Sequence, residues 1–318
     1  MVKILSFITM ALNLTTVFVF GCTGETITEK SGHLNLGIPG IICLGMCGSV
    51  VGCNIYLSMG VNSGFLAIFF VLLFAILFSG LGGLLFAFFT VTLKCNQNVT
   101  GLTLTTFGIG FNTFVVSTIG RNSGFTTVSQ NYFQYLFGAK LATMNAATNF
   151  FFGYGFLFYL AIALAVAATL IMKKTRIGLN LRACGENPAC ADAAGINVNA
   201  YRYIATIIGA VIAGFGGTFL FMNHYKGAIE FDVSNFGWLA VALVIFTMWN
   251  PIIGIAGSFL FAILYYVPSY FNFFEYGKLA TALPYLVTII VLIITSVFNK
   301  RETQGPSALG LSYFREDR

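Results

Sequence analysis

Long apolar runs separated by short polar connections make up most of this chain. A helix needs roughly 20 apolar residues to cross the hydrocarbon core of a bilayer. By this criterion we predict nine membrane spans, at residues 2–20, 36–57, 65–91, 99–118, 151–172, 203–223, 235–249, 252–268 and 281–298. No long hydrophilic stretch separates them, so residues 1–318 are predicted to form a single transmembrane domain.

The composition agrees with this pattern. Of the 318 residues, 58% are hydrophobic and only 8% are charged, whereas a soluble protein carries about 25% charged residues. The predicted fold class is an all-α polytopic membrane protein with about eight to ten transmembrane helices. Some of these helices are expected to be broken, because Asn250-Pro251 divides the short pair of spans at 235–249 and 252–268.

The distribution of cations predicts the orientation. We place the polar loop at 173–202 and the tail at 299–318 in the cytoplasm, and the N-terminus outside. The cytoplasmic side then carries most of the cations, as the positive-inside rule requires. These are Lys30, Lys94, Lys173, Lys174, Arg176, Arg182, Arg202, Lys300, Arg301, Arg315 and Arg318. Lys3, Arg121, Lys140, Lys226 and Lys278 fall outside.

Several motifs are absent, which narrows the function. The chain has no G-x-x-x-x-G-K-[ST] loop and no H-E-x-x-H helix, and its two histidines leave little for a metal site. We therefore expect neither catalysis nor a metal or cofactor. The clustering of cations in a few loops indicates membrane topology rather than nucleic-acid binding. Every acidic residue, Glu25 and Glu29 included, is predicted in a loop or at a span end, which argues against an ion-coupled carrier.

The polar stretch "RACGENPACADAAGI" at 182–196 is conspicuous in so apolar a chain. Gly185 is predicted to end a turn, Asn187 to cap a short helix that has Pro188 in its first turn, and Gly195 to stop that helix. The segment is either an ordinary connector between spans or a helix that docks on another protein. For the cations that precede it, Lys173, Lys174 and Arg176, we favour a topological role.

The same stretch resembles a known loop. "GLNLRACGENPACADAAGI" is similar to the pattern G-x-x-x-R-A-x-G-x-N-P-x-A-A-x-x-x-G-I of the coupling loop in ABC-importer permeases of the ribose and branched-chain amino-acid type. "EKSGHLNLGIPGIICLG" and "GPSALGLSYFRE" resemble stretches of the branch that carries nucleosides and simple sugars and is linked to basic membrane proteins. Pro39 stands where that branch usually has Glu.

The resemblance implies a mechanism and a set of partners. Such a permease is a non-catalytic half of a pathway in the plasma (inner) membrane of a bacterium. A cytoplasmic ATP-binding subunit docks on the coupling helix, a second permease subunit completes the pathway, and an extracytoplasmic substrate-binding lipoprotein delivers the solute. A different second chain is expected, with a homodimer left open. The coupling residues that the resemblance implies are Arg182, Gly185, Glu186, Asn187, Pro188, Ala191 and Gly195.

The solute is less well defined by the sequence. The lack of charge predicted within the spans favours a neutral polar solute such as a nucleoside, with riboflavin or a simple sugar as alternatives. An ATP-independent carrier or channel, or a membrane scaffold or receptor, stays open as another class. The predicted pathway residues are Asn35, Gly37, Gly40 and Asn98, because glycine interrupts the start of the span beside Asn35 and broken helices expose backbone groups in transporters.

Overall fold

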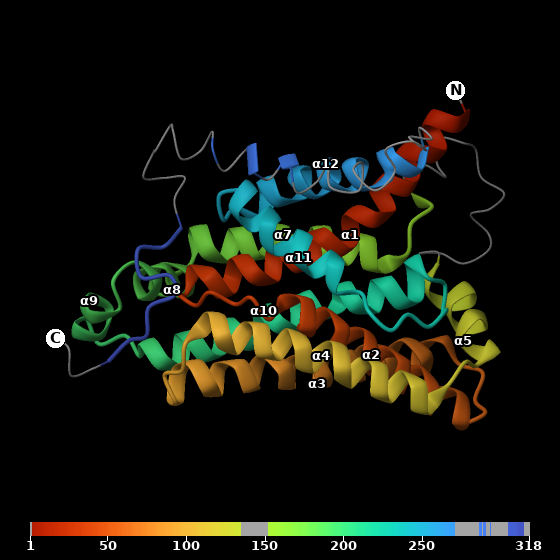
Figure 1. The fold of residues 1–318 in the computed structure, drawn as a ribbon, viewed down its shortest axis with the longest axis horizontal. Helices are drawn as coiled ribbons and strands as arrows, with labels where there is room; N and C mark the ends of the chain where they lie inside the picture. Colours follow the sequence, from red (N-terminus) through yellow and green to blue (C-terminus); the bar gives the residue numbers. More distant parts are fainter. Residues whose placement is uncertain are drawn as a thin grey trace.

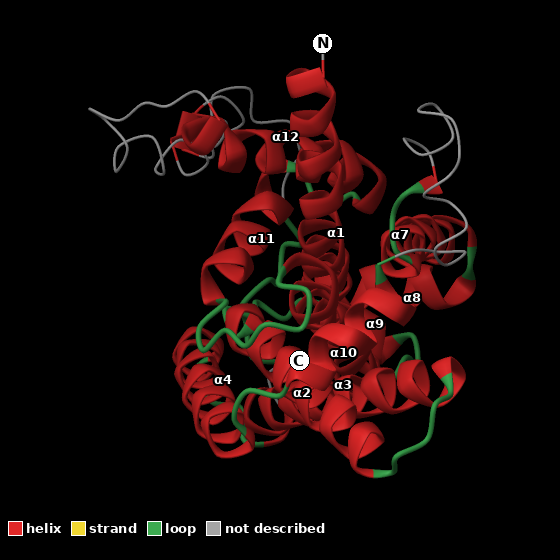
Figure 2. Cartoon of the chain, turned by 90° about the vertical axis from the view of Figure 1, so that its right-hand side faces the viewer, coloured by secondary structure: helices red, strands yellow, loops and turns green. Residues whose placement is uncertain are grey.

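A computed structural model describes residues 2–134, 152–270, 286–287, 289–290, 293 and 305–314. Within these residues every regular element is a helix (Figures 1 and 2). The longer helices are α1 (Val2–Lys30), α2 (Ile38–Ser58), α3 (Gly64–Ala87), α4 (Gln97–Ile119), α7 (Phe156–Lys174), α10 (Val198–Phe219) and α12 (Pro251–Tyr270). The shorter ones are α5 (Ser123–Val128), α8 (Arg176–Glu186), α9 (Pro188–Ala193) and α11 (Ser234–Phe246).

Eight of the nine predicted spans correspond to helices of this structure. Six helices are long and apolar enough to cross a membrane, namely α1 to α4, α7 and α10, with α3 and α10 extended by π-helical turns. The helices α11 and α12 are separate, with the break at Asn250-Pro251 that the sequence predicts. Most of the predicted span at 281–298 lies outside the described residues. The all-α polytopic class is confirmed.

The first helix is longer than predicted. Hydropathy ends the span at Phe20, but α1 continues to Lys30. The added turns carry Gly21 and Gly24, which let α1 approach Ala240 of α11 and Gly209 of α10 closely. Tertiary packing thus keeps a polar, glycine-containing stretch helical, although its composition is typical of a loop.

Glycine contacts hold the central helices together. The helices α2 and α10 are the most enclosed of the six long helices, whereas α3, α4 and α7 lie further out. A Cβ atom on one member of each of three glycine pairs would come closer than 3.0 Å to the other member. These pairs are Gly24–Gly209 between α1 and α10, Gly45–Gly214 between α2 and α10, and Gly40–Gly108 between α2 and α4. Such small-residue contacts are the usual way in which membrane helices approach.

The connections between spans gather at the two ends of the bundle. Residues 31–37, Lys94, the segment α8–α9 and residues 305–314 contact one another at the end where Figure 1 marks the C-terminus. At the other end, the turn of residues 129–134 bonds to the end of α10, where Gln134 Nε2 donates to the carbonyl of Met222 at 2.8 Å. This is the two-sided grouping that the predicted alternation requires, and which side faces the cytoplasm stays a prediction.

The contact between α2 and α4 can be tested on α4 alone. Gly108→Ala places a Cβ atom against the backbone of Gly40, and we expect it to lower the free energy of unfolding by about 1–3 kcal/mol through overpacking. Gly110→Ala is the matched control, because nothing lies within 4 Å of its Cβ position and alanine is the better helix former. Thermal unfolding of the purified protein is the measurement. Equal midpoints for the two variants would contradict the contact.

Candidate functional site

The polar segment between α7 and α10 folds into two capped helices. Thr175 caps α8 by accepting from the backbone N–H of Gly178 at 3.1 Å. Asn187 caps α9 by accepting from the N–H of Cys190 at 3.0 Å, and Pro188 occupies its first position. The predicted cap and first-turn proline are confirmed.

The end of α9 is also the one predicted. Gly195 has φ of +83°, which any residue with a Cβ atom adopts at a cost. Its N–H bonds to the carbonyl of Asp192 at 2.9 Å, and the N–H of Ile196 bonds to that of Ala191 at 3.0 Å. These two bonds form a Schellman motif. The segment is therefore a defined structure rather than a flexible connector.

Gly185 is a contact residue of this segment. It lies in the last turn of α8, which ends one residue later than predicted, at Glu186. A Cβ atom on Gly185 would overlap the carbonyl oxygen of Lys30 at the end of α1. The missing side chain therefore seats α8 directly on the backbone of α1.

The seven predicted coupling residues divide into three groups by burial. Gly185 and Ala191 are buried, so they attach the segment to the rest of the chain instead of offering a surface. Pro188 is half-buried. The exposed members are Arg182, Glu186, Asn187 and Gly195.

Residues 305–314, here called the tail segment, lie across this end of the bundle and fix the α8–α9 segment to it. The N–H of Ala308 donates to the carbonyl of Gly185 at 3.0 Å, and the N–H of Gly310 donates to that of Gly32 at 3.1 Å. This role of the tail segment was not predicted from the sequence, although the tail's resemblance to a family stretch was the available signal.

Side chains add to the attachment of the tail segment. Ser307 Oγ donates to the carboxylate of Glu186 at 2.8 Å, and Tyr313 Oη donates to that of Asp192 at 2.8 Å. Lys94 lies 4.0 Å from the centroid of the Phe314 ring. Glu186, predicted to face a partner, is thus already bonded within the chain.

A buried polar junction lies beneath the tail segment. Arg202 of α10 is 2% exposed and donates to the carbonyl of Leu311 at 3.2 Å. His33 is fully buried, with Nδ1 3.3 Å from the hydroxyl of Thr206. Burial, together with the positive charge of Arg202, lowers the pKa of His33 to about 3, so the imidazole is neutral at physiological pH.

Two carboxyl groups are buried in α1. Glu25 and Glu29 are 0% and 1% exposed and stand one helical turn apart, close enough to interact with each other. Glu25 accepts from the backbone N–H of Asn35 at 3.1 Å, and Glu29 accepts from the indole N–H of Trp249. The sequence predicts both in a loop or at a span end, just beyond a span that ends at Phe20. The structure places them in the last two turns of α1, because this helix continues to Lys30.

Three of the four predicted pathway residues lie together. The side chain of Asn35 accepts from the N–H of Gly37 at 2.9 Å, and Gly40 packs one turn further along α2 against α4. Asn98 is exposed on α4, and its neighbour Gln97 faces this loop instead, accepting from the N–H of Leu34 at 2.8 Å. The assignment of Asn98 to the solute pathway stays a prediction.

Pro39 lies in the first turn of α2, where proline costs little, and it packs against Gly237 of α11. In the part of the chain that the structure describes, no group of three His, Cys, Asp or Glu side chains could hold a metal ion.

This arrangement of long apolar helices with one structured polar connection defines a multi-pass membrane protein. Residues 7–296 match the family described as "Branched-chain amino acid transport system / permease component", and the chain belongs to that family. It is therefore a permease subunit of an ABC transporter, the non-catalytic membrane component, as the resemblance predicted.

Individual relatives match over most of their length. A nucleoside ABC transporter permease of Lactococcus lactis is 30% identical over 94% of each chain. A guanosine ABC transporter permease of Bacillus subtilis is 28% identical over 100% of this chain and 99% of its own. A putative glucose ABC transporter permease of Haloferax volcanii is 31% identical over 78% of this chain and 72% of its own. No solved structure matches the chain.

The attachment of the tail segment leads to a prediction. Replacing both Ser307→Ala and Tyr313→Phe removes two side-chain hydrogen bonds of about 1 kcal/mol each. We expect the amide hydrogens of Ala308 and Gly310 to exchange with deuterium several-fold faster. Tyr203→Phe is the control, because its hydroxyl bonds to Thr92 rather than to the tail segment. Unchanged exchange in the double variant would show that these bonds do not hold the tail segment.

The lowered pKa of His33 leads to a prediction about the pH dependence of stability. The unfolded chain protonates this residue near pH 6.5, but the folded chain does so only near pH 3. Folded stability is therefore complete above pH 6.5 and falls as the pH drops below that value. By pH 5 the loss is on the order of 2 kcal/mol. We expect His33→Asn to flatten the decline of the unfolding midpoint between pH 7.5 and 5, and parallel curves would contradict this assignment.

Proposed function

We propose that this chain is the membrane half of an ATP-driven importer for a nucleoside-like, neutral polar solute. The observation that carries the proposal is the match to the nucleoside and guanosine permeases over nearly the whole of each chain. The putative glucose permease among the relatives keeps a simple sugar as the second candidate, and riboflavin is a third neutral solute of suitable polarity.

The proposed partners follow from the same assignment. A separate cytoplasmic ATP-binding subunit docks on the exposed surface of α8–α9 and hydrolyses ATP. A second permease subunit, expected to be a different chain, completes the pathway. A substrate-binding lipoprotein delivers the solute on the other side of the plasma membrane. In this orientation the α8–α9 end faces the cytoplasm and the N-terminus faces outside.

Rigid attachment supports the proposed role of α8–α9. The segment bears on α1 through Gly185 and Lys30, and it is bonded to the tail segment. A displacement of α9 therefore moves the attached spans with it as a rigid body, which requires no catalytic residue. Asn35, Gly37 and Gly40 line the start of α2 next to this junction, and we keep them as the proposed residues of the solute pathway.

The proposed coupling can be tested at two glycines that each follow a helix. Gly195 and Gly120 both have positive φ, at +83° and +72°, and nothing lies within 4 Å of either Cβ position. Valine strains the backbone at both, and Gly120 is a severe control because its ψ of 179° lies in a region that essentially only glycine adopts. We expect Gly195→Val to lower the amount of solute imported per ATP hydrolysed several-fold, while Gly120→Val at the other end leaves that ratio unchanged.

The assay reconstitutes the permease with its ATP-binding and substrate-binding partners in proteoliposomes. Equal coupling ratios in the two valine variants would overturn the docking role of α9. Uptake by this chain alone, driven by an ion gradient and insensitive to vanadate, would overturn the importer proposal. In that case Glu25 and Glu29, which are buried within α1, are the residues to test for ion coupling.

The solute is tested separately. The cognate substrate-binding protein is titrated with guanosine, uridine, glucose and riboflavin by calorimetry. We expect nucleosides to bind and the others not to bind. Tight binding of glucose with none of guanosine would move the assignment to the sugar branch.

A further inference from the structure

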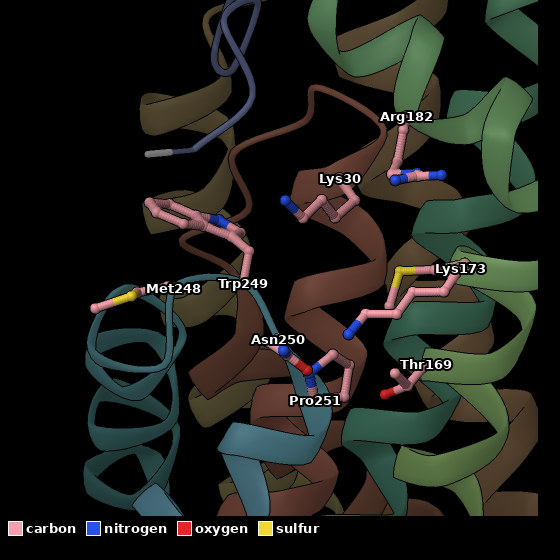
Figure 3. A pocket seen from close by; sticks show the side chains of 9 residues that line it. Lys30, Thr169, Lys173, Arg182, Met248, Trp249, Asn250 and Pro251 are labelled. Carbon is pink, nitrogen blue, oxygen red and sulfur yellow. The ribbon is translucent and has the colours of Figure 1, made fainter. Parts of the chain in front are cut away.

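A small cavity lies where α1, α7, α8 and the connection between α11 and α12 meet (Figure 3). Its volume is about 160 Å³, and it opens to the surface. The lining residues are Lys30, Thr169, Met172, Lys173, Arg182, Met248, Trp249, Asn250 and Pro251. Three of them are cations, and they come from three different helices.

The charges around this cavity are predominantly positive. In Figure 3 the ammonium group of Lys173 extends toward Asn250 and Pro251, while Lys30 and Arg182 lie across the opening from it. The helix α12 begins at Pro251, which has no N–H, and the N–H of Ile252 bonds to Oδ1 of Asn250 at 3.2 Å, so the helix contributes mainly the positive end of its dipole to the cavity. Cations and a helix N-terminus together favour an anion.

The carboxylates near the cavity already accept hydrogen bonds from other residues of the chain. Glu186 and Glu29 are the carboxylates that act on Lys30. Glu186 accepts hydrogen bonds from Ser307, and Glu29 accepts one from Trp249. The hydroxyl of Thr169 donates to the carbonyl of Ala165 at 2.9 Å, so this O–H is already used within α7. Two engaged carboxylates beside three cations leave a net positive charge.

Exposed apolar residues follow the lining residues along α7 and α12. Leu170 of α7 follows the lining residue Thr169 and is 47% exposed. Ile252 and Ile253 of α12 follow the lining residue Pro251 and are 47% and 45% exposed. These three residues belong to helices of the apolar bundle. A molecule in this cavity that also contacts them needs a charged head and an apolar body.

We propose that this cavity binds the phosphate group of an anionic membrane lipid, with Lys30, Lys173 and Arg182 as its cationic ligands. The acyl chains lie along the exposed apolar residues of α7 and α12. Basic pockets between membrane helices are suited to lipid headgroups of this kind. The bound headgroup joins the end of α1, the α8–α9 segment and the start of α12, so the site is independent of which solute the permease carries.

The adjacent residue Lys174 provides a matched control. It stands one position beyond Lys173 in the last turn of α7 and contributes the same charge to membrane topology, but it does not line the cavity. Lys173→Gln and Lys174→Gln therefore remove the same charge from the same helix end. A purely topological role for Lys173 predicts that the two variants behave alike.

The experiment measures lipid binding to the delipidated full-length permease in detergent. Native mass spectrometry follows the titration of dioleoylphosphatidylglycerol, with dioleoylphosphatidylcholine as the zwitterionic comparison. We expect wild type and Lys174→Gln to bind the anionic lipid equally, and Lys173→Gln to bind it about fivefold more weakly. Thermal unfolding midpoints should rise with the anionic lipid in the first two proteins and less in the third.

Three results would overturn the proposal. Equal binding by Lys173→Gln and Lys174→Gln would leave Lys173 with a topological role only. Equal binding of the anionic and zwitterionic lipids would remove the role of charge. A rise in the unfolding midpoint with inorganic phosphate alone, lost in Lys173→Gln, would make free phosphate the occupant in place of a lipid.

Discussion

The contact between Gly185 and the carbonyl of Lys30 is the constraint on which the rest of this end of the protein depends. Because Gly185 has no side chain, α8 rests directly on the last turn of α1. The carbonyl of Gly185 then accepts the N–H of Ala308, which brings the tail segment across the junction, where the carbonyl of Leu311 accepts a hydrogen bond from Arg202. A single close backbone approach thus links the polar connection between spans to the rest of the bundle. It holds α8–α9 rigidly, as the proposed coupling role requires.

The end of α1 also shows how a membrane protein accommodates polar groups. Glu25 and Glu29 would be costly in an apolar environment without partners. Each has one, in the backbone N–H of Asn35 and the indole of Trp249. These bonds connect α1 to the loop before α2 and to the break between α11 and α12, where Trp249 has φ of +53°. Trp249 also lines the basic cavity, so polar contacts, the helix break and the proposed lipid site lie within a few turns of one another.

Prediction from the sequence succeeded where local rules apply and failed where distant contacts decide. The caps at Asn187 and Gly195 were predictable, because a cap depends only on residues within a turn of it. The end of α1 was not, because residues 21–30 are polar and rich in small side chains, and only contacts with α10, α11 and Trp249 keep them helical. Asn98 and Gln97 show the same limit of sequence reasoning. Hydropathy places both near the start of α4, but the direction of each side chain depends on the exact helical phase.

The sequence by itself determined the class of the protein, the approximate position of eight helices, the break at Asn250-Pro251 and the structure of α8–α9. Each of these follows from composition, from the length needed to cross a bilayer, or from capping within one turn. The tertiary structure alone decided which polar residues are partners. Residues as far apart as Glu29 and Trp249, or Gly185 and Ala308, meet only because close glycine contacts bring the helices together. Lys173 differs from Lys174 for the same reason, because the packing of α7 against α1 and α12 decides which of two adjacent, chemically identical side chains faces the cavity.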